Sequence, residues 1–519
     1  MRAVPRCTRS VRKSGRQKSK SRPLSSSETF YWHDYETFGV DPSRDRPVQF
    51  AGLRTDAELN VIGEPLVIYA RPADDCLPHP MACLITGISP QLALEKGLPE
   101  CEFIARIHAE LARPGTCSVG YNSLRFDDEV TRYTLYRNFH DPYAREWQNG
   151  NSRWDIIDML RTAWALRPEG IEWPRREDGS VSFRLEELTA ANGISHAAAH
   201  DALSDVEATI AVARLVRDRQ PRLYDYLLRH RDKRSVQAQL DVAAMKPVLH
   251  ISGMFGNERY NTALVVPLAP HPGNRNEMIC FDLSADPQAL QDLSVDELRQ
   301  RLFARREPPA QGALPIDTPG LAQSEQTRPG LKTIHINRCP VLVPAKMANP
   351  AIAARIGLDG QRCRQHLAWL RQWREREPAA LLEKVQAVYR DRQFEPITDP
   401  DRMLYSGGFF SDRDRQVMER VRAATPDMLA GESFVFEDAR LPEMLFRYRA
   451  RNFPASLTPD ERLQWDEFRF QRLTEPEAGA SICMDEYQAL IEQLQREERP
   501  PAQQQLLQQL LDYGDSLLA

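Results

Sequence analysis

The chain has 519 residues, of which 42% are hydrophobic and 27% are charged, and this length and balance fit two to four domains with separate cores. No apolar run approaches the roughly eighteen residues of a membrane span, which excludes a chain that crosses a bilayer. The net charge of −5 combines +8 over residues 1–28 with −13 over the rest, so charge alone does not decide whether nucleic acid is a partner.

The first 28 residues are basic, rich in serine and nearly free of large apolar side chains, so we expect a disordered tail. A nucleic-acid-binding arm, a transit peptide and a wrongly chosen start codon are the alternative interpretations. The nine cysteines are scattered and odd in number, and they form no C-x-x-C pair. This usage indicates reduced thiols in a cytoplasmic protein, not a disulfide framework or a zinc site.

An α/β domain is predicted over residues 29–220. Strands are expected over 30–36, 48–54 and 61–70 as an antiparallel meander, because turn signals separate these β-rich runs. A helix over 103–111 and a short buried strand over 116–121 follow, and then helices over 127–138, 185–192 and 202–216. Strands followed by interleaved helices predict a mixed sheet.

The pattern changes after Pro221. Short β-type runs at 247–252, 262–266, 278–282 and 333–337, broken by Gly and Pro, predict a small β-rich domain over 221–393 with a flexible insertion at about 311–330. Helical periodicity dominates from about residue 351, in segments at 363–373, 379–389, 415–423, 461–472 and 487–518. We expect a C-terminal helical domain over 394–519.

Two carboxylates end the first predicted strand. Side chains alternate along a strand, so Asp34 and Glu36 point to one side while Tyr35 points into the packing. In isolation this pattern also fits two solvated acids at a strand end. A third carboxylate, Asp127, stands where a strand passes into a helix, and plain helix capping is its alternative.

A histidine and a fourth acid come later in the chain. On one helix His200 and Asp205 would be about 140° apart, so they can face one site only if His200 lies in the loop before the helix. A loop histidine beside acids suits a general base, although a surface histidine is the alternative.

Clustered carboxylates need divalent cations, and oxygen ligands favour Mg²⁺ or Mn²⁺. Two such ions about 4 Å apart would support hydrolysis of a phosphodiester.

Cations and aromatic residues alternate between residues 132 and 167. Single-stranded nucleic acid needs this mixture, because arginine binds phosphates while unpaired bases stack on rings. Helical aromatic residues also often belong to a core, so only part of this set is expected to reach a strand. The set consists of Arg132, Tyr136, Arg137, Tyr143, Trp147, Arg153, Trp154, Arg161 and Arg167.

The order D-x-E, D, H-x₄-D resembles the DEDDh 3′→5′ exonuclease superfamily, which has a ribonuclease H-like fold. Longer motifs resemble bacterial exonuclease I from about residue 30 to the end of the chain. They are HDYETFG at 33–39, GYN at 120–122 with RFDDE at 125–129, NSRWD at 151–155, SGMFG at 252–256, HIN at 335–337 with CP at 339–340, and YRARNFP at 448–454. The basic tail and the insertion depart from the family pattern.

The resemblance implies a ribonuclease H-like exonuclease domain with a mixed sheet, an SH3-like β-rich domain and a C-terminal helical domain, joined in a C shape around single-stranded DNA. It implies a processive 3′→5′ exodeoxyribonuclease, a hydrolase that releases nucleoside 5′-monophosphates by a two-metal mechanism in DNA repair and recombination. It also implies a monomer that binds the acidic tail of single-strand DNA-binding protein.

By the same resemblance, the metal ligands are Asp34, Glu36, Asp127 and Asp205, and His200 is the general base. Glu36 and Arg184 would contact the terminal nucleotide, although Arg184 also fits a solvated arginine at a helix start. Further strand contacts are expected at Arg132, Tyr143, Trp147, Arg161 and Arg167. Lys246, Arg275 and residues 448–451 are expected to line the groove.

Two other functions are compatible with parts of this pattern. A ribonuclease or proofreading subunit of the superfamily would share the acids, but such chains are close to the bare nuclease domain, and here about 300 residues follow Pro221. A catalytically silent DNA-binding module would be expected to lack at least one of the five catalytic residues, and all five are present.

Overall fold

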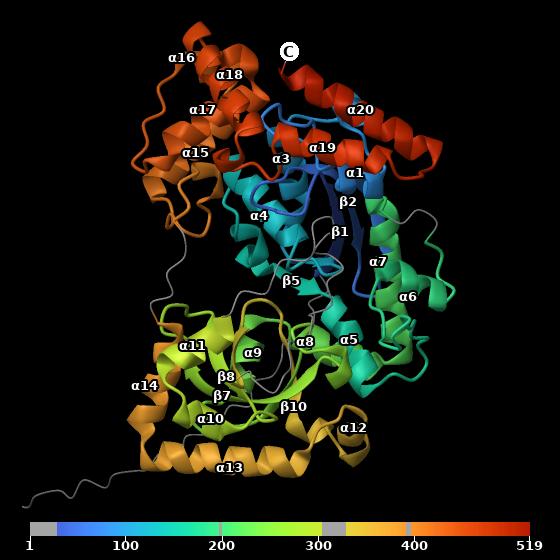
Figure 1. Cartoon of the computed structure of the whole chain (residues 1–519), viewed down its shortest axis with the longest axis vertical. Coiled ribbons are helices and arrows are strands. Elements are labelled where there is room, and N and C mark those ends of the chain that lie inside the picture. Colours follow the sequence, from blue (N-terminus) through green and yellow to red (C-terminus); the bar gives the residue numbers. More distant parts are fainter. Residues whose placement is uncertain (1–27, 197–199, 304–328, 391–395, 519) are drawn as a thin grey trace, which may run out of the picture.

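The computed structural model describes residues 28–196, 200–303, 329–390 and 396–518, which form two β-sheets, the helices packed on them and a group of C-terminal helices (Figure 1). The predicted tail, except Glu28, and the predicted insertion, except its last two residues, lie outside the described residues. Within the described ranges, none of the helices combines the length and apolarity that a membrane span requires. The eight cysteines in these ranges are free thiols.

The first sheet has the strand order β3-β2-β1-β4-β5. Strands β1 (Thr29–Thr37), β2 (Pro47–Thr55) and β3 (Val61–Tyr69) pair antiparallel, as predicted. Strands β4 (Thr116–Gly120) and β5 (Ser152–Asp155) continue the sheet in parallel with β1, which confirms the mixed sheet. Central strand β1 therefore carries the D-x-E motif at its carboxyl end.

Helices cover both faces of this sheet. On one face Tyr31 and Tyr35 pack against α3 (Glu100–Leu111) and α4 (Asp127–Arg137). On the other face Trp32 packs in a core with α5 (Ile157–Leu166), α7 (Ala202–Arg219) and α8 (Pro221–Arg229), and α6 (Leu185–Ala191) lies beside α7. In Figure 1, α4 and α7 lie on opposite sides of the sheet. Because side chains alternate along β1, Asp34 and Glu36 share the face of Trp32 and point toward α7.

The second sheet is antiparallel with the order β10-β6-β7-β8-β9. Its strands are β6 (Val248–Ile251), β7 (Thr262–Pro270), β8 (Glu277–Asp282), β9 (Leu331–His335) and β10 (Val341–Pro344). The four predicted runs are confirmed as β6 to β9. The four-residue β10 was not predicted, because a run this short beside Cys339-Pro340 carries little periodicity. Smaller helices flank the sheet: α9 (Lys233–Gln239), α10 (Pro287–Asp292), α11 (Val295–Phe303) and α12 (Pro350–Arg355).

The helical pattern after residue 351 belongs to two different cores. Helices α13 (Gly360–Arg376) and α14 (Pro378–Tyr389) pack on the second sheet, where Trp373 and Val385 share a core with Phe281. The remaining helices form the C-terminal group at the top of Figure 1: α15 (Asp412–Ala423), α16 (Pro426–Gly431), α17 (Arg440–Asn452), α18 (Pro459–Thr474), α19 (Met484–Gln495) and α20 (Pro501–Leu518).

One helical prediction in this region was wrong. The segment 487–518 was expected as a single helix, but the structure divides it into α19 and α20 between Gln495 and Pro501. Pro500 and Pro501 supply no backbone N–H, and the residue before a proline is pushed away from helical angles, so the first helix ends before them. Helices α19 and α20 then pack on α1 (Pro80–Thr86) and α2 (Pro90–Lys96) of the first domain.

Buried ion pairs also join the C-terminal helices to the first domain. Arg451 donates to Asp75 at 2.7 and 3.1 Å and to Asp401 at 2.8 Å, and all three side chains are buried. Burial by itself would raise the pKa of Asp75 and of Asp401, but the arginines around them, Arg451 first, hold both pKa values well below the ordinary range. The prediction that residues 448–451 line a DNA groove was therefore wrong for these side chains, since Tyr448 and Arg449 are buried as well.

Replacing Arg451 by methionine is expected to lower the free energy of unfolding by about 3–5 kcal/mol, because two buried carboxylates would lose their shortest ion pair. Asp75 would keep the longer ion pair with Arg472 at 3.5 Å, and Asp401 would keep the longer one with Arg447 at 3.3 Å. Urea denaturation followed by tryptophan fluorescence measures this change, and the Trp465 ring lies 5.6 Å from the Arg451 guanidinium. Arg496→Met is the control. Its exposed pair with Glu492 at 3.4 Å should contribute less than about 1 kcal/mol. Equal destabilisation by the two variants would contradict the role of the buried cluster.

The same cluster predicts a pH dependence. Because the folded-state pKa values of Asp75 and Asp401 are depressed, their stabilising contribution is present above the unfolded carboxyl pKa of about 3.9 and is lost as the pH falls. The stability difference between the wild type and Arg451→Met should therefore shrink below about pH 4. Urea titrations at pH 7 and pH 3.5 test this expectation.

Candidate active site

The two acids of the D-x-E motif lie where β1 runs past its neighbour. Strand β1 pairs with β4 only from Thr29 to Trp32, so its carboxyl half leaves the β4 side open beyond that point. Asp34 is partly exposed there and Glu36 is buried, with an irregularity in the β2 pairing directly after Glu36. Both carboxylates thus face a space that other elements can enter.

Asp127 enters this space as the first residue of α4. Its buried Oδ1 accepts a hydrogen bond from the backbone N–H of Tyr35 at 3.1 Å. Tyr35 is the middle residue of the D-x-E motif. The preceding turn is held by Asp155, which accepts from the backbone N–H groups of Asn122 at 2.9 Å and Leu124 at 3.2 Å. Asp127 therefore connects α4 to the strand of the D-x-E motif, which the helix-capping alternative does not explain.

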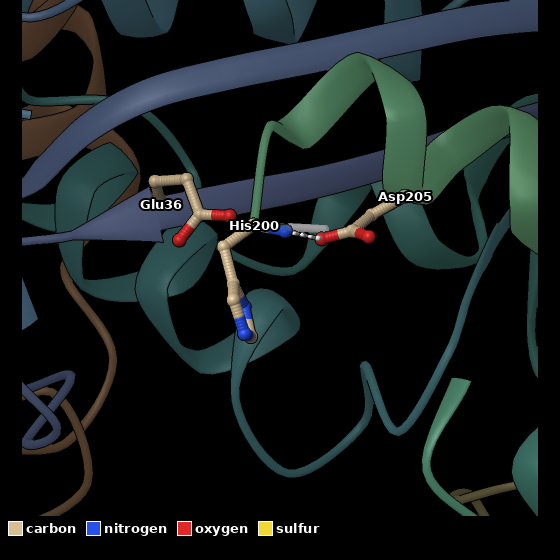
Figure 2. Close-up of side chains that lie close together, drawn as sticks. All are labelled: Glu36, His200 and Asp205. Carbon is tan, nitrogen blue, oxygen red and sulfur yellow. Dashed lines mark hydrogen bonds between the residues drawn. The ribbon is translucent and has the colours of Figure 1, made fainter. Parts of the chain in front are cut away.

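His200 lies in the loop before α7, as its proposed role required. It has a positive φ of 66°, and the following residue, Asp201, is the N-cap of the helix. Asp205 is in the first turn, and its Oδ2 accepts the backbone N–H of His200 at 3.2 Å. Ligand atoms of Glu36, His200 and Asp205 lie within 4.8 Å of one another, with the two carboxylates on either side of His200 in Figure 2.

The carboxylates of this site repel each other. Burial raises the pKa of Asp34 well above its ordinary value, and the charges of Asp127, Glu36 and Asp205 raise it further. Burial raises the pKa of Glu36 in the same way and that of Asp127 to about 8. Divalent cations between these oxygens would remove the repulsion, and carboxylate oxygens are the ligands that Mg²⁺ and Mn²⁺ prefer.

Sequence analysis missed a second histidine at this site. The Nε2 of His196 lies 2.5 Å from Oδ1 of Asp205, and its Nδ1 lies 3.3 Å from Oγ1 of Thr189 on α6. The spacing H-x₃-H-x₄-D was visible in the sequence. Only its H-x₄-D part, which contains His200 and Asp205, carries the predicted site.

The predicted strand contacts form no single cluster. Arg132 is buried, and its guanidinium donates to Glu146 at 2.7 Å, to Glu129 at 2.8 Å and to Tyr405 at 3.0 Å. Its contact with DNA stays a prediction, and in this structure it joins α4 to residues far along the chain. Trp147 is 66% exposed, and Tyr143 is partly buried beneath the Arg132 guanidinium.

Two exposed aromatic residues from the C-terminal part of the chain join Tyr143. The rings of Tyr405 and Phe409 lie 6.4 and 6.1 Å from the Tyr143 ring, and Phe409 is 79% exposed. Neither was predicted, because nothing in residues 403–410 indicates that they lie beside a residue more than 260 positions earlier. We call Tyr143, Trp147, Tyr405 and Phe409 the aromatic surface.

A cavity of about 1020 Å³ lies between the first domain and the second sheet. The first domain contributes Arg125 and Arg161 to its lining, and the second contributes Lys332 and Arg338. Arg161 donates to Asp158 at 2.7 Å. A side chain at Gly253 would approach its guanidinium to 2.8 Å, so this motif glycine leaves room for the arginine.

The other predicted cations lie on separate elements. Arg184 is the N-cap residue of α6, 39% exposed at its side chain and 3.8 Å from Glu187. Arg167 follows α5 and donates to the carbonyl of Leu166 at 2.5 Å. Lys246 and Arg275 are exposed on the second domain. Their contacts with DNA stay predictions.

Comparison with known families matches three regions of the chain. Residues 31–213 match the model of an exonuclease, residues 231–391 that of the exonuclease I SH3-like domain, and residues 398–517 that of the exonuclease I C-terminal domain. The predicted order of an exonuclease domain, an SH3-like domain and a helical domain is thereby confirmed.

Relatives match over nearly their whole length. Exodeoxyribonuclease I of Escherichia coli (strain K12) is 48% identical over 94% of this chain and 98% of the relative. Exodeoxyribonuclease I of Haemophilus influenzae is 44% identical over 94% of this chain and 99% of the relative.

Solved structures agree with the fold. Exonuclease I from Methylocaldum szegediense has a TM-score of 0.86 and 50% identity, covering 95% of this chain and all of that one. The zinc-bound complex of Escherichia coli exonuclease I with single-stranded DNA has a TM-score of 0.86 and 47% identity at the same coverage. A complex of SSB and exonuclease I with an inhibitor has a TM-score of 0.83 and 46% identity, covering 94% of this chain and 99% of that one.

Proposed function

The chain belongs to the exonuclease I family, and from this membership we propose that it is a processive 3′→5′ exonuclease that hydrolyses single-stranded DNA to nucleoside 5′-monophosphates, in DNA repair and recombination. The observation that carries the proposal is the approach of Glu36, His200 and Asp205 to within 4.8 Å, at the end of the strand that also carries Asp34.

The four carboxylates are the proposed ligands of two Mg²⁺ or Mn²⁺ ions. Carboxylate oxygens that repel one another fit such ions, and Asp34 and Asp127 approach from different elements. Bound ions would supply the positive charge that lowers the pKa of a water and stabilises the leaving 3′ oxygen. The protein's part is to fix the oxygens before the strand arrives.

His200 is the proposed general base. Its exposed position before α7 lets the imidazole take a proton from the water that attacks the terminal phosphorus. The bond between phosphorus and the 3′ oxygen of the preceding nucleotide then breaks, and the 5′-monophosphate leaves. Arg184 and Glu36 are proposed to contact the terminal nucleotide and so to position that phosphorus.

The strand is proposed to reach this site along the aromatic surface, where unpaired bases can stack on the exposed rings of Trp147, Tyr405 and Phe409. Arg161 and the other cations of the 1020 Å³ cavity are proposed to bind phosphates, together with Lys246 and Arg275. Enclosure of the strand between the domains supports processivity, because a strand held on several sides dissociates slowly.

Replacing Phe409 by alanine is expected to weaken binding of a single-stranded oligonucleotide by about 5- to 150-fold, the equivalent of about 1–3 kcal/mol for one stacked base. Its exposure leaves little packing to lose, so the melting temperature should not change. Fluorescence anisotropy in EDTA measures binding without cleavage. Leu463→Ala, a change of a 70% exposed side chain on α18, is the control and should bind as the wild type does. If Phe409→Ala bound the oligonucleotide as tightly as the wild type does, the proposal that DNA passes along the aromatic surface would be contradicted.

The chain is further proposed to act as a monomer and to bind the acidic tail of single-strand DNA-binding protein. The solved complex of a relative with SSB supports this partner. Analytical ultracentrifugation with and without a tail peptide tests both statements.

Substrate choice separates the proposed function from a ribonuclease. We expect Mg²⁺-dependent degradation of a single-stranded DNA, with no degradation in EDTA and much slower degradation of the same sequence as RNA or as a blunt duplex. Equal attack on RNA would favour the ribonuclease alternative, and tight binding without cleavage would favour the silent module.

A further inference from the structure

His196 is the residue of the site to which the mechanism above gives no role. It follows α6 and precedes α7, and its side chain is only 5% exposed. Its two ring nitrogens face different helices, since Nε2 lies 2.5 Å from Asp205 of α7 and Nδ1 lies 3.3 Å from Thr189 of α6. The imidazole thus connects a proposed metal ligand to a neighbouring helix.

The chemistry of these contacts sets the direction of the hydrogen bonds. An ionised carboxylate only accepts, so the proton between His196 and Asp205 is on Nε2, which donates it. The Thr189 hydroxyl suits either state of Nδ1, because it can donate to the ring or accept from it. Oγ1 of Thr189 also lies 2.9 Å from the carbonyls of Leu185 and Glu186 on α6, and the single hydroxyl proton goes to one of these oxygens when the hydroxyl accepts from Nδ1.

The other oxygen of Asp205 is held as well. Oδ2 accepts the backbone N–H of His200 at 3.2 Å, while Oδ1 accepts from His196. Each carboxylate oxygen has two lone-pair sites, so both oxygens keep one for a cation after accepting these hydrogen bonds. The carboxylate is therefore oriented without being blocked, and the same group fixes the backbone of the proposed general base.

We propose that His196 is a positioning residue. It holds the Asp205 carboxylate in the orientation that binds a divalent cation, and through that carboxylate it fixes the backbone of His200. Mutation of a residue that hydrogen-bonds to a metal ligand typically lowers metal affinity or activity by about 10- to 100-fold. The inference rests on the proposed metal site, and it assigns to His196 no proton transfer with the substrate.

The test is calorimetric titration of Mn²⁺ into the full chain without DNA, for the wild type, His196→Ala and His196→Gln. His196→Ala is expected to bind Mn²⁺ about 10- to 100-fold more weakly than the wild type. The amide N–H of His196→Gln can still donate to Asp205, so this variant should recover most of the affinity. Thr189→Val should weaken binding in the same direction but by less, since it removes only the support of the ring.

Two results would overturn the inference. The first is that His196→Ala binds Mn²⁺ as tightly as the wild type does. The second is that His196→Ala and His196→Gln weaken Mn²⁺ binding equally, because the packing of the side chain would then matter and its N–H donor to Asp205 would not. If the wild type itself bound no Mn²⁺, the proposed metal site would fail instead. Nuclease assays across Mg²⁺ concentrations should show a higher half-saturating Mg²⁺ concentration for His196→Ala, with partial recovery of the rate at saturation.

Discussion

Asp34→Ala is expected to abolish hydrolysis of single-stranded DNA, with a loss well above the 100-fold that removal of a supporting partner can cause, while strand binding persists. The pKa of Asp34 is raised by burial and then by the charges of Asp127, Glu36 and Asp205, so the other three acids all act on it. Its removal would take away one of the four proposed ligands of the cations. The aromatic surface and the cation-lined cavity would stay intact for binding.

Single-turnover hydrolysis and anisotropy measured on the same preparation test this expectation. Asp34→Asn keeps the shape of the side chain and should be as inactive as the alanine variant, since it removes the charge. Glu64→Ala, a change of an exposed carboxylate on β3, is the control and should retain full activity. Hydrolysis by Asp34→Ala at the wild-type rate would contradict the metal assignment.

His200→Ala is expected to reduce the rate of hydrolysis by about 10²- to 10⁴-fold, the contribution of a positioned general base. Measurement of the single-turnover rate of the wild type and the variant at saturating Mg²⁺ tests this effect.

The location of His200 allows a second role, and the same variant distinguishes the two. Its ring lies within 4.8 Å of ligand atoms of Glu36 and Asp205, so it could act as a metal ligand. A general base can be lost without loss of metal, and we therefore expect His200→Ala to bind Mn²⁺ as the wild type does. Loss of Mn²⁺ binding in proportion to the rate would identify His200 as a ligand and contradict the assignment as base.

Local patterns were sufficient to predict much of this molecule. The β-rich run over residues 30–36 correctly predicted β1, observed over Thr29–Thr37, and alternation along it predicted the common face of Asp34 and Glu36. Helix geometry alone required His200 to precede its helix, and in the structure it precedes α7. These successes share a cause, because each depends on residues within a few positions of one another.

Contacts between distant parts of the chain were not predicted. Arg451 was expected to contact DNA, but its guanidinium forms an ion pair with Asp75, which lies 376 residues earlier in the chain. Arg132 donates a hydrogen bond to the hydroxyl of Tyr405, 273 residues later, while its ion pairs with Glu129 and Glu146 are local. A sequence shows that an arginine is charged, but it does not show whether a carboxylate of another domain forms an ion pair with it. His196 was different, since its spacing to Asp205 was local and could have been used.

Processive degradation is tested by following a long, 5′-labelled single-stranded DNA after mixing with the protein, Mg²⁺ and an excess of unlabelled competitor strand. We expect shortening from the 3′ end to very short products with few intermediates, because each strand stays bound between the domains while the site at Asp34, Glu36 and Asp205 removes successive nucleotides. Shortening that stops after one or a few nucleotides, cleavage at internal positions, or the same products in EDTA would contradict it.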